Sequence, residues 1–279
     1  MAIIEVKGLC YTYPESETPS LIDIDFRADP GEFVLVTGPS GCGKTTFCRV
    51  LNGLIPNSYG GDFKGTVVVD GMLTATTPVY ELAQHVGLVF QNPENELFCT
   101  TVEREVAFGP ENLALSREEI MMRVEEALET VGISHLKEKS PEELSGGEQQ
   151  KVAIAALLAM KPKVLVLDEP TANLDPVSAK SVLELMYRLN EKNGVTVILV
   201  EHRLEMVSNL VDRCIVFDAG RIIADGAPRE VLYSEKVSEL GVGIPKIVQV
   251  SKHLSEFVGE QLRFLSSDEL ASYIRGRRN

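Results

Sequence analysis

Eight consecutive residues near the N-terminus have the spacing of a loop that binds phosphate. They fit the pattern GxxxxGK[ST] and lie between a short apolar run, 33–37, that is predicted to be a strand and a predicted helix. Glycines let the backbone curl so that several N–H groups point at phosphate oxygens, and the helix N-terminus adds positive potential. The lysine supplies a charge to the outer phosphates, and the threonine hydroxyl suits Mg²⁺. The residues of this predicted cradle are Gly38, Pro39, Ser40, Gly41, Cys42, Gly43, Lys44 and Thr45.

A second candidate group is a pair of carboxylates that follows a short apolar run, 164–167. Such a run predicts a buried parallel strand, and ligands of parallel sheets bind beyond the carboxyl ends of the strands. Asp168 is placed to hold Mg²⁺, directly or through water. Glu169 would point to the opposite side of the strand if the extended chain continued. There it could polarise a water molecule for attack on a phosphate.

The third group opens another predicted helix. Ser145 and Glu148 have the spacing of a capping box, and Gly146 and Gly147 leave the helix end sterically open. This end would bind an anion separately from the first loop. A Ser-x-x-Glu cap alone is a common structural feature, whereas the run Leu-Ser-Gly-Gly-Glu-Gln-Gln at 144–150 is not.

Predicted strands and helices alternate along the chain, which indicates an α/β fold built on a parallel sheet. Besides the two strands above, short apolar runs predict strands at 66–70, 86–90, 195–200 and 215–217. Apolar periodicity and end signals predict helices at 45–54, 116–131, 175–192 and from Ser140-Pro141 onward. From about residue 234 the pattern becomes helical, and Ser266 with Glu269 marks a helix start.

Composition bounds the class of protein. The 279 residues include 27 basic and 41 acidic side chains, and a net charge of −14 makes the chain a poor partner for nucleic acid or anionic lipid. No run approaches the roughly 18 apolar residues of a membrane span, and the N-terminus lacks the pattern of a secretory signal. Five scattered cysteines without metal spacing indicate a reducing compartment. We therefore expect a cytoplasmic protein that reaches a membrane only through a partner.

Found together and in this order, these groups resemble the motifs of an ABC transporter ATPase over about residues 3–230. The phosphate loop resembles the Walker A motif, 164–169 the Walker B motif with its catalytic glutamate, and 144–148 the signature motif. The resemblance implies a P-loop NTPase of the ABC ATPase type. Such a fold has a RecA-like parallel sheet core, an antiparallel β part, a helical subdomain and, here, a helical C-terminal extension.

The resemblance also implies roles for single residues, with ATP and Mg²⁺ as cofactors. The catalytic set is Lys44, Gln91 of the Q-loop, Glu169, which polarises water, and the switch histidine His202, which stabilises the γ-phosphate. Mg²⁺ is assigned to Thr45, Gln91 and Asp168. Tyr13 lies where the family stacks an aromatic ring on adenine. Beyond the loop 38–45, the nucleotide-binding set includes Tyr13, Thr46, Ser145, Gly146, Gly147, Glu148 and, in the D-loop Asn173-Leu174-Asp175, Asp175.

One copy of each motif implies a dimer with two composite sites. In the family, ATP bound at Lys44 of one chain is completed by Ser145 and Gly147 of the other. The partner would be a second ABC ATPase chain, identical or paralogous, and integral membrane transport subunits would bind the pair. The chain would then be peripheral on the cytoplasmic face of the cell membrane, with no nucleic-acid partner.

Two stretches resemble the ATPases of energy-coupling-factor importers, which take up vitamins or transition-metal ions. They are 87–113, with Gln-Asn-Pro-x-x-x-x-Phe and Val-Ala-Phe-Gly-Pro-Glu-Asn, and 51–61, with Leu-Asn-Gly-Leu-Ile-Pro. The implied organisation is an ATPase domain at 1–233, with a helical subdomain at about 92–160, and a helical extension at 234–279 for a dimer contact. The alternative is a soluble ABC ATPase that acts on nucleic acid or ribosomes, but no coiled-coil insertion, second ATPase copy or basic face is visible.

Three positions depart from the family pattern. Cys42 lies where serine is commoner, Glu201 precedes His202 where threonine is commoner, and the D-loop begins Ala172-Asn173 rather than Ser-Ala. Strand alternation should send the Glu201 carboxylate to the face opposite His202. Cys42 stands at a helix N-terminus beside Lys44, which predicts a lowered thiol pKa and the greatest reactivity of the five cysteines. The alternative is that the thiol is packed under the loop and inert.

Overall fold

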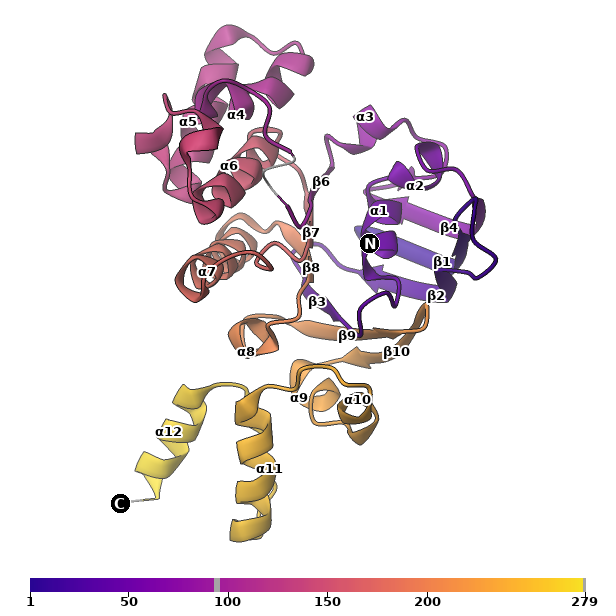
Figure 1. Cartoon of the computed structure of the whole chain (residues 1–279), viewed down its shortest axis with the longest axis vertical. Helices are drawn as coiled ribbons and strands as arrows, with labels where there is room; N and C mark the ends of the chain where they lie inside the picture. The colour runs from indigo at the N-terminus through magenta and orange to yellow at the C-terminus, as the bar shows by residue number, and fades with distance from the viewer. Residues whose placement is uncertain (93–95, 278–279) are drawn as a thin grey trace.

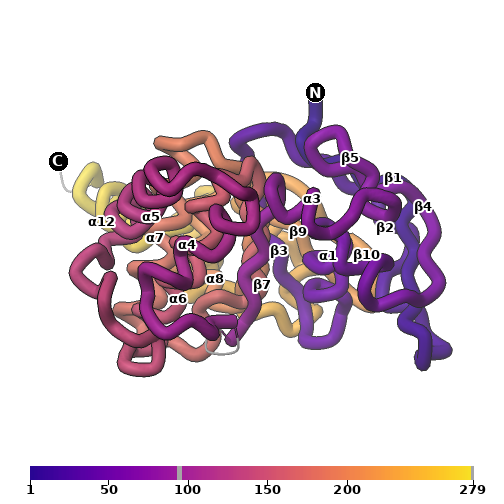
Figure 2. The backbone as a smooth tube through the Cα atoms, turned by 90° about the horizontal axis from the view of Figure 1, so that it is seen from above, coloured from indigo at the N-terminus to yellow at the C-terminus, as the bar shows by residue number. Residues whose placement is uncertain are grey.

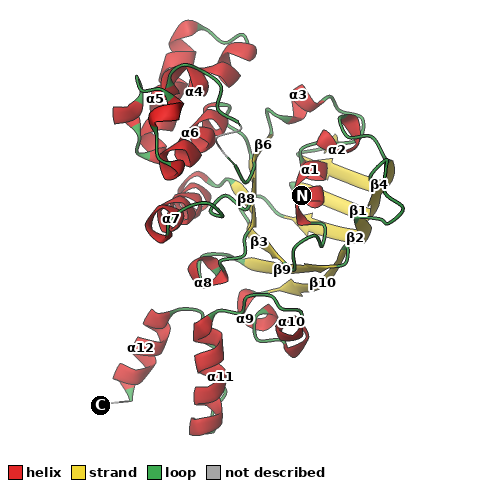
Figure 3. Ribbon diagram, in the orientation of Figure 1, coloured by secondary structure: helices red, strands yellow, loops and turns green. Residues whose placement is uncertain are grey.

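The computed structural model of the chain, which describes residues 1–92 and 96–277, contains a six-stranded and a four-stranded sheet with helices around them (Figures 1 and 3). The strands are β1 (Ile4–Thr12), β2 (Leu21–Ala28), β3 (Phe33–Thr37), β4 (Asp62–Val69), β5 (Met72–Leu73), β6 (Val86–Val89), β7 (Val164–Asp168), β8 (Thr196–Val200), β9 (Arg213–Asp218) and β10 (Arg221–Gly226). The α-helices are α1 (Lys44–Leu51), α2 (Leu54–Asn57), α3 (Val79–Leu82), α4 (Val102–Asn112), α5 (Arg117–Val131), α6 (Gly146–Ala159), α7 (Pro176–Asn193), α8 (Leu204–Val207), α9 (Pro228–Val231), α10 (Glu235–Glu239), α11 (Lys246–Val258) and α12 (Ser267–Gly276).

The larger sheet has the strand order β10-β9-β3-β8-β7-β6. Its strands pair in parallel except at one edge, where β10 runs antiparallel to β9. The carboxyl ends of β3, β6, β7 and β8 therefore lie on the same side of the sheet, where ligands of parallel sheets bind. The phosphate loop, Gln91, the carboxylate pair and His202 follow these four strands, so the predicted parallel sheet is confirmed and accounts for their meeting.

Side-chain alternation gives the larger sheet two cores. On β3, Phe33 and Leu35 face one hydrophobic cluster with the helices, whereas Val34 and Val36 face a second cluster with α1 and the smaller sheet. The neighbouring strands β7 and β8 divide in the same way. Because both faces are covered, the strands are apolar throughout, as expected of parallel strands. Figure 2 shows β3, β7 and β9 between helices α4–α7 on one side and β1, β2 and β4 on the other.

The smaller sheet is antiparallel and has the order β2-β1-β4-β5. Bulges interrupt the pairing of β1 with both β2 and β4. Its apolar face packs against α1 in the second hydrophobic cluster. The smaller sheet thus supports the helix that follows the phosphate loop. The antiparallel β part that the family resemblance implies is therefore present.

Helices α4, α5 and α6 form a separate group between β6 and β7 in the chain (Figure 1). The expected start of a helical subdomain near residue 92 borders residues 93–95, which lie outside the described residues. Helices α10, α11 and α12 form the expected helical C-terminal part, with Ser266 accepting a hydrogen bond from the Glu269 N–H at the start of α12. Within the described ranges, no helix combines the length and the apolar character needed to cross a bilayer.

The expected helix from Ser140 onward is wrong. Residues Pro141–Glu143 make only a 3-10 turn, and Leu144 is extended, with ψ near 149°. The helix begins instead at Gly146, because Ser145 and Glu148 cap it there. The helix predicted at 45–54 ends earlier, at Leu51, where Gly53 with φ 77° turns the chain.

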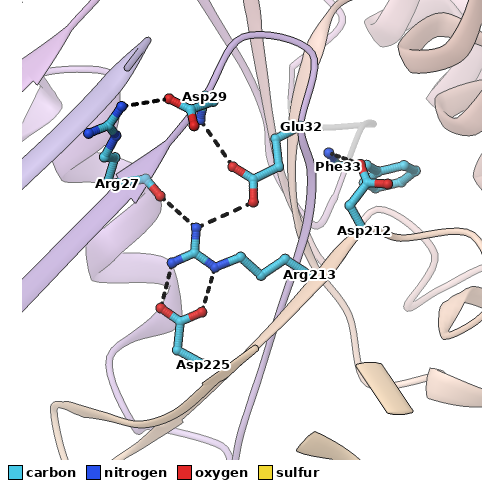
Figure 4. A network of polar contacts seen from close by, with 7 residues as sticks. All are labelled: Arg27, Asp29, Glu32, Phe33, Asp212, Arg213 and Asp225. Carbon is cyan, nitrogen blue, oxygen red and sulfur yellow. Dashed lines mark hydrogen bonds and ion pairs between the residues drawn. The ribbon is translucent and has the colours of Figure 1, made fainter. Parts of the chain in front are cut away.

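Two polar networks tie together the amino ends of the parallel strands, away from the phosphate loop. In the network of Figure 4, the Arg213 guanidinium at the start of β9 pairs with both carboxylate oxygens of Asp225 and donates to the Arg27 carbonyl oxygen at 2.8 Å and to Glu32 at 3.3 Å. At the other end of the sheet, Asp70 contacts Lys163, just before β7, and His85, just before β6, with N···O distances of 2.8 and 2.5 Å.

Candidate functional site

The phosphate loop needs glycine for both conformation and space. Gly38 has φ 145°, and a Cβ there would lie 2.1 Å from the carbonyl oxygen of Phe217. Gly43, immediately before α1, has φ 109°, and its Cβ would lie 2.6 Å from the carbonyl oxygen of Ser20. Since other residues rarely adopt these φ values, the curled loop depends on glycine at both positions. The predicted strand, loop and helix are thus found in the expected order.

The Lys44 side chain lies inside the loop. It is only 5% exposed, and its Nζ donates to the carbonyl oxygens of Gly38 and Pro39, both at 2.9 Å. These contacts hold the ammonium at the centre of the loop, where a phosphate would replace the carbonyl oxygens as its partner. The placement agrees with the predicted role of Lys44, which stays a prediction.

The expectation of a reactive Cys42 is wrong. The side chain is 4% exposed, and burial raises the pKa of its thiol more than nearby Lys44 lowers it. Its Sγ lies 3.8 Å from Lys44 Nζ, under the loop rather than at its surface. Proximity to a helix N-terminus therefore does not decide the reactivity here, because desolvation penalises the thiolate.

Asp168 ends β7, and the Thr45 hydroxyl lies beside its carboxyl group. Burial raises the pKa of the Asp168 carboxyl, and the hydrogen bond from Thr45 opposes this effect. Its Oδ1 is buried without a hydrogen-bond partner among the described residues. A buried carboxylate oxygen without a partner, next to a hydroxyl, is a donor set that Mg²⁺ accepts. The residues thus fit the predicted metal.

Glu169 departs from the extended chain that we expected. Its φ of 52° lies in the left-handed region, so the strand ends at Asp168 and the side chain is aimed by a turn instead of by strand alternation. Two predicted partners meet its carboxylate. His202 Nε2 lies 2.9 Å from Oε1, and Gln91 Nε2 donates to Oε2 at 3.4 Å. The structure thus brings three of the four predicted catalytic residues into direct contact.

A cavity of about 310 Å³ joins Gln91 and Glu169 to the phosphate loop, whereas His202 lies behind Glu169 and does not line it. The lining includes Gln91 and Glu169 on one side and the amino end of α1 on the other. One residue that the sequence analysis did not single out, Ser20, also takes part. The full lining is Ser20, Ser40, Gly41, Gly43, Lys44, Thr45, Thr46, Gln91 and Glu169.

The predicted signature residues lie elsewhere. Ser145 and Glu148 form the expected capping box at the start of α6, and hydrogen bonds from Ser145 lower the pKa of Glu148. Gly147 allows a close approach of α7, since a Cβ there would lie 2.8 Å from the Cβ and Oγ of Ser178. None of Ser145, Gly146, Gly147 and Glu148 lines the cavity described above, so the two helix ends that are predicted to bind anions lie apart within one chain.

Tyr13 and Asp175 have partners within the chain. The Tyr13 hydroxyl lies 3.2 Å from Thr46 Oγ1 and accepts from Arg49 at 3.1 Å, which places the ring beside the phosphate loop. Asp175 caps α7 by accepting from the N–H groups of Val177 and Ser178. The Ser178 side chain, followed by these two N–H groups, lowers the pKa of Asp175. Their predicted contacts with nucleotide remain predictions.

Sequence reasoning missed the contacts that join the loops around Glu169. Arg203 donates to backbone carbonyls of the D-loop, and Thr171 donates to Glu201. Asn173 donates to Asn92, the neighbour of Gln91, at 2.6 Å. The unusual Glu201 was the one signal available in the sequence, whereas the other contacts join residues that are 29 or more positions apart.

The chain is similar to proteins of the ABC transporter family. The family model described as ABC transporter matches residues 21–172. A Pyrococcus abyssi protein, provisionally assigned as an ABC transporter ATP-binding protein, is 46% identical over 98% of both chains. A Methanosarcina acetivorans protein with the same provisional assignment is 46% identical over 91% of this chain but only 42% of its own length.

Solved structures agree with these relatives. CbiO1 of Clostridium perfringens, part of the ABC transporter complex cbiONQ, superposes with a TM-score of 0.76 at 34% identity, covering 90% of this chain and 99% of that one. A dimeric ATP-binding cassette in a post-hydrolysis state, bound to ADP and Pi, superposes with a TM-score of 0.70 at 29% identity over 81% and 99% of the two chains. The fold is therefore shared with ATP-binding cassettes that hydrolyse ATP, and this chain belongs to the ABC transporter family as an ATP-hydrolysing ATP-binding subunit.

Proposed function

We propose that this subunit powers substrate uptake through a membrane importer of the energy-coupling-factor class, for a vitamin or a transition-metal ion. The observation that carries the ATPase part is the contact of Gln91 and His202 with Glu169 at the rim of the phosphate cavity. The importer class is supported by the stretches at 51–61 and 87–113 and by the likeness to CbiO1. Residues 93–95 of the second stretch lie outside the described residues.

We assign nucleotide binding to the loop 38–46 and Tyr13. Lys44, already held among carbonyl oxygens, exchanges them for phosphate oxygens. Thr46 and Tyr13, which contact one another, lie on the side of α1 that would receive the rest of the nucleotide. When Mg²⁺ is bound, it neutralises phosphate charge, and Thr45, Asp168 and Gln91 are the residues that would hold it.

In hydrolysis, Glu169 acts as the general base that takes a proton from the attacking water. His202 and Gln91 orient its carboxylate from two sides. The left-handed turn at Glu169 supports this role, because it turns the carboxylate from the strand towards the cavity.

The composite site requires a second cassette, identical or paralogous, whose Ser145, Gly146, Gly147 and Glu148 would face the phosphates from the other side. Asp175 would approach the same nucleotide. Exposed apolar residues on the C-terminal helices, including Phe257 at 89% exposure, suit a further contact between the two chains. Membrane subunits would bind this pair on the cytoplasmic face of the membrane, and the charge of −14 disfavours the nucleic-acid alternative.

Glu169→Gln tests the site and the dimer together. The amide keeps its size but loses its basicity, so hydrolysis should fall at least about a hundredfold while ATP still binds. ATP would then hold the dimer closed, so the share of dimer detected by light scattering should be larger in Mg-ATP than in ADP. Cross-linking of α6 in one chain to α1 in the other gives an independent readout.

Glu125→Gln, which removes an exposed carboxylate on α5, is the matched control and should behave as wild type. Wild-type turnover in Glu169→Gln would refute the assigned base. Equal masses and cross-linking in ATP and ADP would refute the closed dimer. Recovery of the chain with ribosomes instead of integral membrane proteins would refute the transport assignment.

A further inference from the structure

The segment that carries His202 is bonded to the turn 171–175 at two points. We propose that Glu201 and Arg203, the two neighbours of His202, are positioning residues that join the switch histidine to this turn, so that the two move as one unit. The inference rests on the proposed function, since the turn leads to Asp175 and is predicted to face the nucleotide of a partner chain.

Glu201 provides the first connection. Its side chain is 2% exposed, and the fully buried Thr171 donates its hydroxyl to Oε2. The other oxygen, Oε1, accepts the N–H groups of His202 at 2.8 Å and of Arg203 at 2.9 Å. Hydrogen bonds to a carboxylate are stronger than those between neutral groups, so this one side chain holds the backbone beside the histidine to Thr171.

Arg203 provides the second connection. Its guanidinium donates to the carbonyl oxygen of Leu174 at 3.0 Å and to that of Ala172 at 3.2 Å. The planar group therefore spans the turn from one side, in the fixed geometry that distinguishes arginine from lysine. Within the turn, the Ala172 N–H donates to the Glu169 carbonyl oxygen at 3.1 Å. This hydrogen bond ties the turn 171–175 to the backbone of Glu169, the predicted base.

The contacts close into a ring around the predicted base. Glu169 contacts His202 and Gln91, the Glu201 and Arg203 bonds continue from His202 to the turn, and Asn173 in the turn donates to Asn92, next to Gln91. A displacement of His202 therefore cannot leave the turn in place unless hydrogen bonds break. Neither Glu201 nor Arg203 lines the phosphate cavity, so both act through other residues.

Single variants give the first test. Arg203→Ala should lower kcat about tenfold or more and leave KM for ATP within about twofold, because the nucleotide cradle is untouched. Arg203→Lys should be intermediate, since one ammonium cannot span two carbonyls. Thr171→Val should lower kcat, and Thr171→Ser, which keeps the hydroxyl, should restore it. Urea unfolding of each variant confirms that it is folded.

Mixed dimers provide the decisive test, because a chain with Lys44→Ala cannot use its own phosphate loop. Arg203→Ala is placed either in the Lys44→Ala chain or in the chain with the intact loop, and each dimer is compared with a reference of wild type and Lys44→Ala. In the first arrangement, the released turn faces the working nucleotide from the partner. We expect hydrolysis to fall about tenfold or more there.

The possible failures are distinguishable. If the reference dimer does not form or hydrolyse ATP, the composite site itself is refuted. In a second outcome, the reference dimer hydrolyses ATP and the first arrangement hydrolyses it at the same rate, whereas Arg203→Ala in the chain with the intact loop lowers the rate. Arg203 would then serve only its own site, and the connection to the partner would be refuted. A common loss of affinity for ATP in the Arg203 and Thr171 variants would likewise overturn the positioning role.

Discussion

Replacement of Glu96 by glutamine should stabilise the fold in alkaline but not in acidic solution. Oε1 of Glu96 accepts the N–H of Phe90 at 2.9 Å, at the point where β6 leads into Gln91. Burial nevertheless raises the pKa of this carboxyl from 4.5 to about 7, more than the N–H group lowers it. Glutamine keeps the acceptor oxygen and carries no charge, so the variant isolates the cost of the ionised form.

The sign and size follow from proton linkage. Because the folded pKa lies above the unfolded value of 4.5, the folded state binds more protons, and stability falls as the pH rises from about 4.5 through about 7. With these two values, stability would fall by about 2.5 kcal/mol between about pH 5 and about pH 8. Since part of the side chain faces water, we expect about 1 kcal/mol.

Urea unfolding followed by circular dichroism, at several pH values between about 5 and 8, measures the effect. The free energy of unfolding of Glu96→Gln should exceed that of wild type near pH 8, and the two curves should converge near pH 5. Glu125→Gln removes an exposed carboxylate and is the control for net charge. A constant difference between Glu96→Gln and wild type at every pH would refute the burial argument.

Three further outcomes are expected. Lys44→Ala removes charge-assisted contacts worth about 1.5–3 kcal/mol, so calorimetry should show nucleotide binding weakened at least about tenfold, and unchanged affinity would contradict the phosphate loop. Gly147→Ala places a Cβ 2.8 Å from the Ser178 side chain, so the free energy of unfolding should fall by about 1–3 kcal/mol in a thermal unfolding experiment. A second substitution, Ser178→Gly, should recover most of this loss. A double variant as unstable as Gly147→Ala would contradict the packing argument. Maleimide should label the half-buried Cys10 before the buried Cys42, as followed by mass spectrometry, and faster labelling of Cys42 would contradict the argument from burial.

Local rules were sufficient where one segment carries its own constraint. The phosphate loop could be predicted because its glycines, lysine and flanking strand lie within 13 residues, 33–45. The capping box at Ser145 and Glu148 is likewise complete within one turn. The helix at 175–192 could be placed because Asp175 caps one end and Gly194, with φ 67°, ends the other.

Other elements carry contradictory local signals. Strand β2 includes Asp23 with φ 52°, and bulges disturb its pairing with β1, so its apolar alternation is irregular. Strand β10 lies at a sheet edge and none of its residues is fully buried, which leaves little hydrophobic pattern. Helix α4 contains Gly109 and Pro110, residues that normally argue against a helix.

At the site, sequence reasoning identified the residues but not their connections. Glu169 could be proposed from its place after a predicted strand, and Gln91 and His202 only from the family resemblance. The left-handed turn that aims Glu169 leaves no mark in the residue type. Arg203 and its carbonyl partners are separated by about 30 positions. Only the fold brings them together, because β7 and β8 are neighbours in the sheet.

The polar networks at the amino ends of the strands determine which part of the molecule can yield during a catalytic cycle. Arg213 fastens β9 to the turn before β3, and Asp70 fastens the smaller sheet to the residues that precede β6 and β7. These contacts hold the amino ends of the parallel strands in fixed positions relative to the smaller sheet. The opposite edge carries its reactive groups on loops that are joined mainly to one another. When a phosphate bond breaks there, the loops can therefore move together relative to a sheet that is held in place at its other end.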